Sequence, residues 1–180
     1  DTQLSLMGGL AFALFYTFLG VPIAVVADRK SRVWIMSIAL AIWSAMTALC
    51  GVAQNFTQLF LARLGVGVGE AGGVAPAYSL IADYFPSEKR GRALSIYSFG
   101  IPIGSALGIL LGGVLTSYLD WRSAFIIVGL AGLLLAPVLR LTVRDPDRGG
   151  YDAGPPLTPA QIVEVARRIS RKKSFWSLSL

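Results

Sequence analysis

The stretch LFLARLGVGVGEAGGVAPAYSLIADY, from Leu59 to Tyr84, is an apolar run that carries Arg63 and Glu70 in its interior. Seven residues make almost two helical turns, so both side chains leave one face of a helix, about 10 Å apart along its axis. A charge at bilayer depth costs at least roughly 2.5 to 3.5 kcal/mol on insertion scales. The pair therefore indicates a polar cavity, an ion route or a buried ion pair inside a membrane protein.

Composition supports a membrane protein. Of 180 residues, 54% are hydrophobic and 14% are charged, whereas an ordinary soluble domain has about 25% charged residues. The charges are bunched, and the uncharged runs between them are close to the roughly 20 helical residues that cross a bilayer. Lipid-facing segments of this length must be helices. We predict an all-α membrane protein with five spans, at about 4–26, 33–53, 57–84, 91–118 and 122–141.

The basic residues predict an orientation. All of the 16 Lys and Arg residues except Arg63 and Arg122 fall on one side of the predicted spans. The positive-inside rule makes that side cytoplasmic. We expect a multi-pass protein of the plasma membrane, or of the inner membrane in a bacterium. The net charge of +6 then indicates contact with anionic membrane lipids and not with nucleic acid.

The composition changes after the fifth span. Residues 145–159 are rich in proline and glycine, as linkers are. Thr158, Pro159 and Gln161 then form a helix start, which predicts an amphipathic helix over about 159–173. This helix either lies on the cytoplasmic membrane surface or is a solvated linker. We therefore divide the chain into a partial transmembrane half (1–141), a cytoplasmic linker (142–174) and the start of another transmembrane helix (175–180).

Glycines recur at helical spacing in two of the spans. Gly67, Gly69 and Gly72 spell GxGxxG, but no strand precedes them, so a dinucleotide site is rejected. Small residues spaced by four let helix backbones approach closely. The stronger series, in the fourth span, consists of Gly100, Gly104, Gly108 and Gly112. It predicts a tight contact with another helix along most of that span. The glycine pattern around Gly129 in the fifth span is less regular.

The residues that most enzymes need are scarce. The chain has no histidine and one cysteine, Cys50. Histidine metal sites, Ser-His and Cys-His catalytic pairs and disulfides are thereby excluded within this sequence. We expect no catalytic residue, no metal site and no cofactor, and no phosphate-binding GxxxxGK[ST] loop is present.

Two basic turns carry a family resemblance. The turn AVVADRKSRV (24–33) resembles the signature loop of the major facilitator superfamily at Asp28, Arg29 and Arg32. The sequence ADYFPSEKRGRA (82–93) resembles the connection between the fourth and fifth helices of the same superfamily. The resemblance implies a cytoplasmic gating network of five charged residues. Its members are Asp28, Arg29, Arg32, Asp83 and Arg92.

The stretch 63–108 resembles the Spinster-type branch of this superfamily. The resemblance implies a major-facilitator-like helical bundle in which this chain holds helices two to six of twelve, followed by the central linker. It also implies alternating access, with Arg63 and Glu70 handling substrate or protons. The implied substrate is an amphiphilic anion such as a lysophospholipid or a sphingoid phosphate, and the expected partners are membrane lipids, protons and the remaining helices of the transporter.

Two alternatives to a proton-coupled lipid carrier stay open. A carrier of small soluble organic anions would share the same basic turns. A membrane protein without transport activity would hold Arg63 and Glu70 as a static ion pair, because buried pairs need carry no chemistry.

Overall fold

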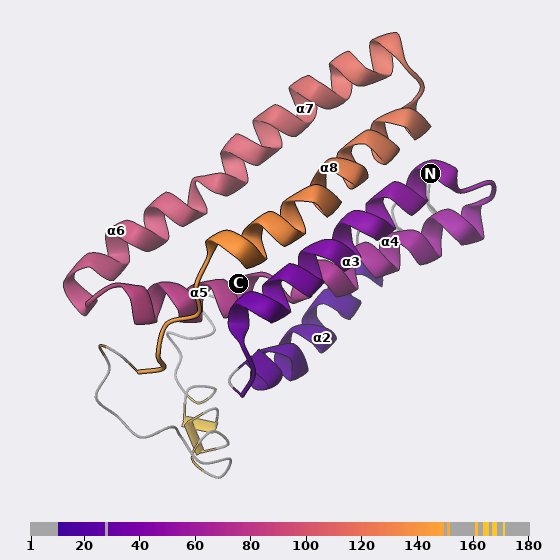
Figure 1. The fold of residues 1–180 in the computed structure, drawn as a ribbon. Helices are drawn as coiled ribbons and strands as arrows, with labels where there is room; N and C mark the ends of the chain where they lie inside the picture. Colours follow the sequence, from indigo (N-terminus) through magenta and orange to yellow (C-terminus); the bar gives the residue numbers. More distant parts are fainter. Residues whose placement is uncertain are drawn as a thin grey trace.

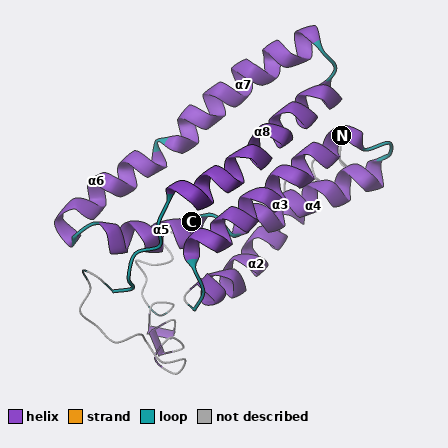
Figure 2. Ribbon diagram, in the orientation of Figure 1, coloured by secondary structure: helices purple, strands orange, loops and turns teal. Residues whose placement is uncertain are grey.

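The structure is a computed structural model that describes residues 11–27 and 29–149, together with residues 151, 161, 164, 165, 167, 168 and 171. Within these residues it contains helices and connecting turns and no strand (Figure 2). The all-α fold class is therefore confirmed. The helices are α2 (Ala11–Ala27), α3 (Arg32–Val52), α4 (Phe56–Ala71), α5 (Val74–Tyr84), α6 (Ser87–Ser98), α7 (Gly100–Tyr118) and α8 (Trp121–Thr142).

Helix α3 lies at the centre of the bundle, between α8 and α4 (Figure 1). Helix α2 packs on α4, and α7 runs beside α8 at the opposite edge. Most of the residues that α3 buries are small, and they include Ser37, Ala39, Ser44, Cys50 and Gly51. Small residues bring helix backbones close together, which gives membrane helices the van der Waals contact that holds them. The composition of α3 thus explains why two helices pack tightly against it.

Very close approaches between helices occur at glycines of α4 and α8. A β-carbon added to Gly129 of α8 would lie 2.7 Å from the backbone oxygen of Ser44 and 2.7 Å from the β-carbon of Ala48. A β-carbon on Gly69 of α4 would lie 2.5 Å from the backbone nitrogen of Trp43. These separations are shorter than real β-carbons adopt, so only glycine fits at either place.

No helix among the described residues contacts the glycine series of α7, so the tight contact that its spacing predicts stays a prediction. A β-carbon added to Gly100, Gly104, Gly108 or Gly112 would meet no atom within 4 Å in the described part of the chain. Helix α7 also has no buried residue. The spacing identifies a common face of the helix, but it does not say which neighbour covers that face. Within the described residues the demand for glycine falls instead on Gly129, in the less regular pattern.

Two of the predicted spans are each divided into two helices. The third span, predicted over 57–84, is interrupted at Gly72 and Gly73, between α4 and α5. The fourth, predicted over 91–118, begins earlier, at Ser87, and is interrupted at Phe99. A proline ring clashes with the carbonyl group four residues before it. Pro76 stands four residues after Gly72, where the first interruption begins, and Pro102 stands four residues after Ser98, the last residue of α6, so proline and glycine together account for both breaks.

The exterior of the bundle is apolar. Large side chains such as Ile101 (70% exposed), Ile109 (76%) and Leu134 (72%) lie on the surface. By length and composition, three helical stretches of the described chain are suited to cross a membrane: Arg32–Val52, Ser87–Tyr118 and Trp121–Thr142. Exposed apolar area of this extent is typical of surfaces that face lipid.

Both ends of α8 carry an arginine stacked on a tryptophan. The guanidinium carbon of Arg122 lies 4.3 Å from the ring centre of Trp121, and that of Arg140 lies 5.1 Å from the ring centre of Trp34. Tryptophan and arginine are favoured at the two interfaces between membrane and water. These pairs therefore mark two levels, one at each end of α8, that suit the two faces of a bilayer.

Candidate functional site

Helix α4 carries both ionisable residues of the central stretch. The helix begins after Asn55, whose side chain accepts a hydrogen bond of 2.9 Å from the backbone N–H of Gln58. From this start Arg63 and Glu70 fall on one face, about 10 Å apart along the axis. Arg63 is exposed, and its guanidinium carbon lies 5.5 Å from the ring centre of Phe125 on α8. Glu70 is half-buried, one residue before α4 ends.

Arg63 and Glu70 do not form an ion pair with each other. Among the described residues, the ion pairs within 4.0 Å are both formed by a different arginine, Arg32. A guanidinium group over a phenyl ring is held weakly, by about 0.5 to 1 kcal/mol at exposed sites. The face of α4 therefore presents a cation and a carboxyl group that are not committed to one another.

A cluster of three tyrosines reaches the Glu70 end of this face through Tyr16. The rings of Tyr78 on α5 and Tyr97 on α6 pack edge to face, with their centres 5.8 Å apart. Tyr16 on α2 lies within electrostatic reach of Glu70 and Tyr78. The sequence analysis did not single out these residues. The sequence does mark them, because each tyrosine places a polar hydroxyl group inside an otherwise apolar span.

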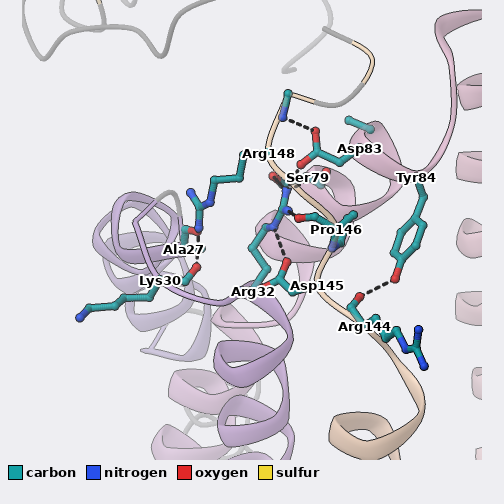
Figure 3. A network of polar contacts seen from close by, with 12 residues as sticks. Ala27, Lys30, Arg32, Ser79, Asp83, Tyr84, Arg144, Asp145, Pro146 and Arg148 are labelled. Carbon is teal, nitrogen blue, oxygen red and sulfur yellow. Dashed lines mark hydrogen bonds and ion pairs between the residues drawn. The ribbon is translucent and has the colours of Figure 1, made fainter.

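A second polar cluster lies at one end of the bundle, where α2, α3 and α5 meet the segment that follows α8 (Figure 3). Its centre is Arg32, the first residue of α3, of which only 2% is exposed. We call the cluster of Arg32, Ser79, Asp83, Asp145 and Pro146 the Arg32 network. A buried guanidinium group is stable only when its donors are satisfied, and this network supplies the acceptors.

Each donor group of Arg32 has a partner. The backbone N–H donates to Oδ2 of Asp145 at 2.8 Å, and Nε donates to Oδ1 of the same carboxylate at 3.1 Å. Nη1 pairs with the carboxylate of Asp83 and donates to Oγ of Ser79 at 3.1 Å. Nη2 donates to the carbonyl oxygen of Pro146 at 3.0 Å. One side chain thus joins the start of α3, the end of α5 and the segment after α8.

Further bonds hold the same segment in place. Arg148 donates to the carbonyl oxygen of Ala27 at 2.9 Å, at the end of α2, and also to the carbonyl oxygen of Lys30. The backbone N–H of Gly149 donates to Asp83 at 3.2 Å. The hydroxyl group of Tyr84 donates to the carbonyl oxygen of Arg144 (Figure 3). Residues 144–149 are therefore tied across the ends of three helices.

The surroundings of Asp145 favour the charged form of its carboxyl group. Its partial burial alone would raise its pKa, but hydrogen bonds from Ser31 and Arg32 and the charge of Arg32 outweigh burial. The net effect lowers the pKa of Asp145 below its ordinary value. The ion pair with Arg32 is thus kept at every pH at which a free aspartate is ionised.

The structure joins some of the predicted gating residues and not others. Arg32 and Asp83 are in direct contact. Arg92 on α6 is exposed and makes no hydrogen bond or ion pair to the Arg32 network within the described chain, and the side chain of Arg29 is exposed as well. Asp28 lies outside the described residues, as do residues 175–180 and most of the amphipathic helix predicted over 159–173.

Asp145 and Arg148 are the charged residues at this end of the bundle that were not predicted from the sequence to take part in the contacts there. They belong to the run VRDPDR (143–148), which was read only as the beginning of a linker. Alternating acidic and basic residues directly after a span, on the same side as the turn 28–32, were the available signal.

Comparison with known proteins gives the family. The model of the Major Facilitator Superfamily matches residues 1–180. An MFS-type efflux pump of Mycolicibacterium smegmatis is 34% identical over 178 residues, which cover 97% of this chain and 40% of that protein. Protein spinster homolog 1 of Homo sapiens is 35% identical over 175 residues, which cover 94% of this chain and 33% of that protein.

Solved structures agree with the sequence relatives. A bacterial homologue of the human lysosomal transporter Spinster, in an inward-facing and unoccupied conformation, superposes with a TM-score of 0.79 at 41% identity. The match covers 99% of this chain and 43% of that one. An inward-facing and occupied conformation gives a TM-score of 0.76 at 40% identity. The chain thus spans less than half the length of these relatives, and it belongs to the major facilitator superfamily, with its resemblance to the Spinster-type branch confirmed.

Proposed function

We propose that this chain is part of a secondary active transporter that works by alternating access and couples an amphiphilic anion to protons. In such transporters, substrate and coupling ions bind near the midplane of the membrane, between two halves that rock about the site. In this proposal the chain supplies helices two to six and the linker to the second half. The basic ends of its helices face the cytoplasm, as the positive-inside rule requires.

The observation that carries the proposal is the state of the two charges on α4. Arg63 and Glu70 share one face of the helix, and no ion pair joins them within the described residues. A static pair would satisfy both charges permanently. Separate charges at membrane depth instead require partners that come and go, and an anionic substrate and a proton are such partners.

The two residues take different roles. Arg63 is exposed and has a planar guanidinium group, which binds phosphate or carboxylate oxygens in two places at once. Glu70 is half-buried and lies within electrostatic reach of Tyr16, one of the three tyrosines. A carboxyl group whose surroundings alternate between dry and wet can bind a proton in one state and release it in the other. Phenol hydroxyl groups beside it can donate or accept a hydrogen bond in either state.

The proton role is tested with the full-length transporter in liposomes under an imposed pH gradient. We expect Glu70→Gln, which fixes a neutral group of nearly the same shape, to abolish uptake driven by the gradient and to leave substrate binding partly intact. Glu88→Gln is the matched control, because Glu88 is an exposed carboxylate outside the site. Uptake by Glu70→Gln at the wild-type rate, with unchanged pH dependence, would show that Glu70 carries no proton.

The anion role is tested by binding. A hydrogen bond to a charged group is worth about 1.5 to 3 kcal/mol, so Arg63→Ala should weaken binding of an anionic substrate by roughly 10-fold to 150-fold. Arg63→Lys, which keeps the charge and loses the planar fork, should lie between Ala and the wild type. Equal affinity in all three proteins would contradict a substrate contact at Arg63.

The same liposomes separate the alternatives. Uptake of soluble organic anions in preference to lysophospholipids and sphingoid phosphates would identify a carrier of soluble anions. Absence of uptake of either class would favour a static module. In such a module the Arg63 and Glu70 charges depend on each other, so each single variant should lose stability and the double variant should lose less than either single variant.

A further inference from the structure

An apolar groove lies on another face of the bundle, between α2 and α3 and above α4. Its volume is about 340 Å³, within the roughly 300 to 1,000 Å³ of ligand pockets. Every residue that lines it is apolar, from Leu19 and Val26 on α2 to Ile35 and Ile42 on α3. Its floor includes Gly69 and Gly72 of α4. Neither Arg63 nor Glu70 contributes to it.

The groove runs along the two helices and reaches their basic ends. The lining spans eight residues of α2, from Leu19 to Val26, and eight of α3, from Ile35 to Ile42, or about 10 Å of each helix. Val26 and Ile35 stand at its mouth, one residue from the end of α2 and three from the start of α3. The mouth is open, since Val26 is 50% exposed and Ile38 is 49% exposed.

Two basic residues are tied to this mouth through their backbone. Arg29 and Lys30 are exposed, and their N–H groups donate to the carbonyl oxygen of Val26 at 3.0 Å and 2.9 Å. Their side chains make no hydrogen bond or ion pair with the rest of the described chain. The nearby acidic groups Asp83 and Asp145 are both bonded to Arg32, and Asp28 lies outside the described residues. The mouth therefore combines an uncommitted pair of positive charges with an entrance to purely apolar space.

The lining and the charges at the mouth distinguish between possible occupants. An apolar helix packed on the groove would leave the charges of Arg29 and Lys30 without a partner. A soluble ligand would need polar partners inside the groove, and its lining offers none. A single hydrocarbon chain needs no polar partner and gains free energy with each methylene that it buries.

We propose that the groove binds one acyl chain of an anionic phospholipid whose phosphate is held by Arg29 and Lys30. The site is independent of the proposed transport function, because it lies on a different face from Arg63 and Glu70. It predicts a resident membrane lipid that is bound by its charge as well as by its chain. Each basic residue near an anionic membrane surface contributes about a fivefold gain in affinity.

The experiment uses the full-length transporter in phosphatidylcholine vesicles that contain a minority of phosphatidylglycerol. The phosphatidylglycerol carries a diazirine on one acyl chain, and the labelled peptides are identified after irradiation. A parallel sample carries the diazirine on phosphatidylcholine. We expect the anionic probe to label residues between 19 and 42 far more strongly than the zwitterionic probe does.

Two pairs of variants test the two parts of the site. Arg29→Gln with Lys30→Gln should lower labelling by the anionic probe about 25-fold, whereas Lys89→Gln with Arg144→Gln, which removes two other exposed basic residues, should not. Val26→Trp should fill the mouth and lower labelling, whereas Val128→Trp, at a position of similar exposure (52%) on α8, should not. Circular dichroism of each variant checks that it is folded.

Three results would overturn the proposal. Equal labelling by the two probes would show that charge does not select the lipid. Unchanged labelling in the glutamine pair would remove Arg29 and Lys30 from the site. Absence of label between residues 19 and 42 would show that another part of the transporter covers the groove.

Discussion

Replacing Asp145 by alanine should loosen the segment after α8 without unfolding the helices. The carboxylate accepts two hydrogen bonds from Arg32, at 2.8 Å and 3.1 Å, and about a quarter of the side chain is exposed. Hydrogen bonds to charged groups are worth about 1.5 to 3 kcal/mol each. They share one acceptor and are partly solvated, so we expect a total loss of about 2 kcal/mol. Arg32 retains Asp83, Ser79 and the carbonyl oxygen of Pro146, which limits the loss.

A loss of about 2 kcal/mol corresponds to roughly 30-fold more frequent local opening. Amide hydrogen exchange of the full-length transporter in nanodiscs measures this opening directly. The amide of Arg32 should lose protection first, because Asp145 is its acceptor, and the amide of Gly149, which donates to Asp83, should follow.

Asp147→Ala is the matched control. Asp147 lies two residues further along the same segment, is exposed, and forms no ion pair within the described residues. Its replacement should leave exchange unchanged. Equal effects of the two substitutions, or protection of Arg32 within about twofold of the wild type in Asp145→Ala, would refute the reasoning from these bonds.

The other predictions concern packing, pH and one tyrosine. Gly129→Ala should destabilise the folded protein by about 1 to 3 kcal/mol through overpacking. The added methyl group of Gly104→Ala meets no atom of the described chain, so this variant should be neutral or stabilising by up to about 1 kcal/mol. Equal falls in the melting temperatures of the two variants would contradict the helix contacts. Because the pKa of Asp145 is lowered in the folded state, its stabilising bonds should be complete above the ordinary aspartate pKa of about 3.9 and lost only as the pH falls below it. The measurement is the protection of the Arg32 amide in the wild type minus that in Asp145→Asn, followed against pH. Loss of this difference between pH 7 and pH 5 would contradict the lowered pKa of Asp145. Tyr84→Phe should cost about 0.5 to 1.5 kcal/mol and raise exchange in the segment after α8, and unchanged exchange would show that this bond is not formed in solution.

The sequence was sufficient for the helices but not for their contacts. Hydrophobic runs and turn residues placed α3 and α8 within a residue or two, because length and apolarity are local properties. The interruptions at Gly72 and Phe99 depend on prolines a few residues further along the chain, so both interruptions could have been predicted from the sequence. The family resemblance placed Arg32 and Asp83 in one predicted network, and the two side chains form an ion pair.

What the sequence could not provide was the choice of partners. Gly104 and Gly129 both stand in glycine patterns, yet only Gly129 faces a neighbouring backbone in the described chain. Asp145 lies 113 residues from Arg32, and no local pattern specifies that pairing. Arg92 has the charge that a gating network needs but lies on an exposed part of α6. Partners of this kind are decided by tertiary packing, which a pattern of spacings does not encode.

The separation of Arg32 from Asp145 also has a consequence for how the protein is made. A ribosome adds about 5 to 20 residues per second, so roughly 6 to 23 seconds pass between the synthesis of Arg32 and that of its partner 113 residues later. Throughout this interval the backbone N–H and the Nε atom of Arg32 lack the carboxylate of Asp145 as their hydrogen-bond acceptor. The first turn of α3 therefore reaches its final state only after α8 has been synthesised, because Asp145 and Pro146 follow α8 in the chain.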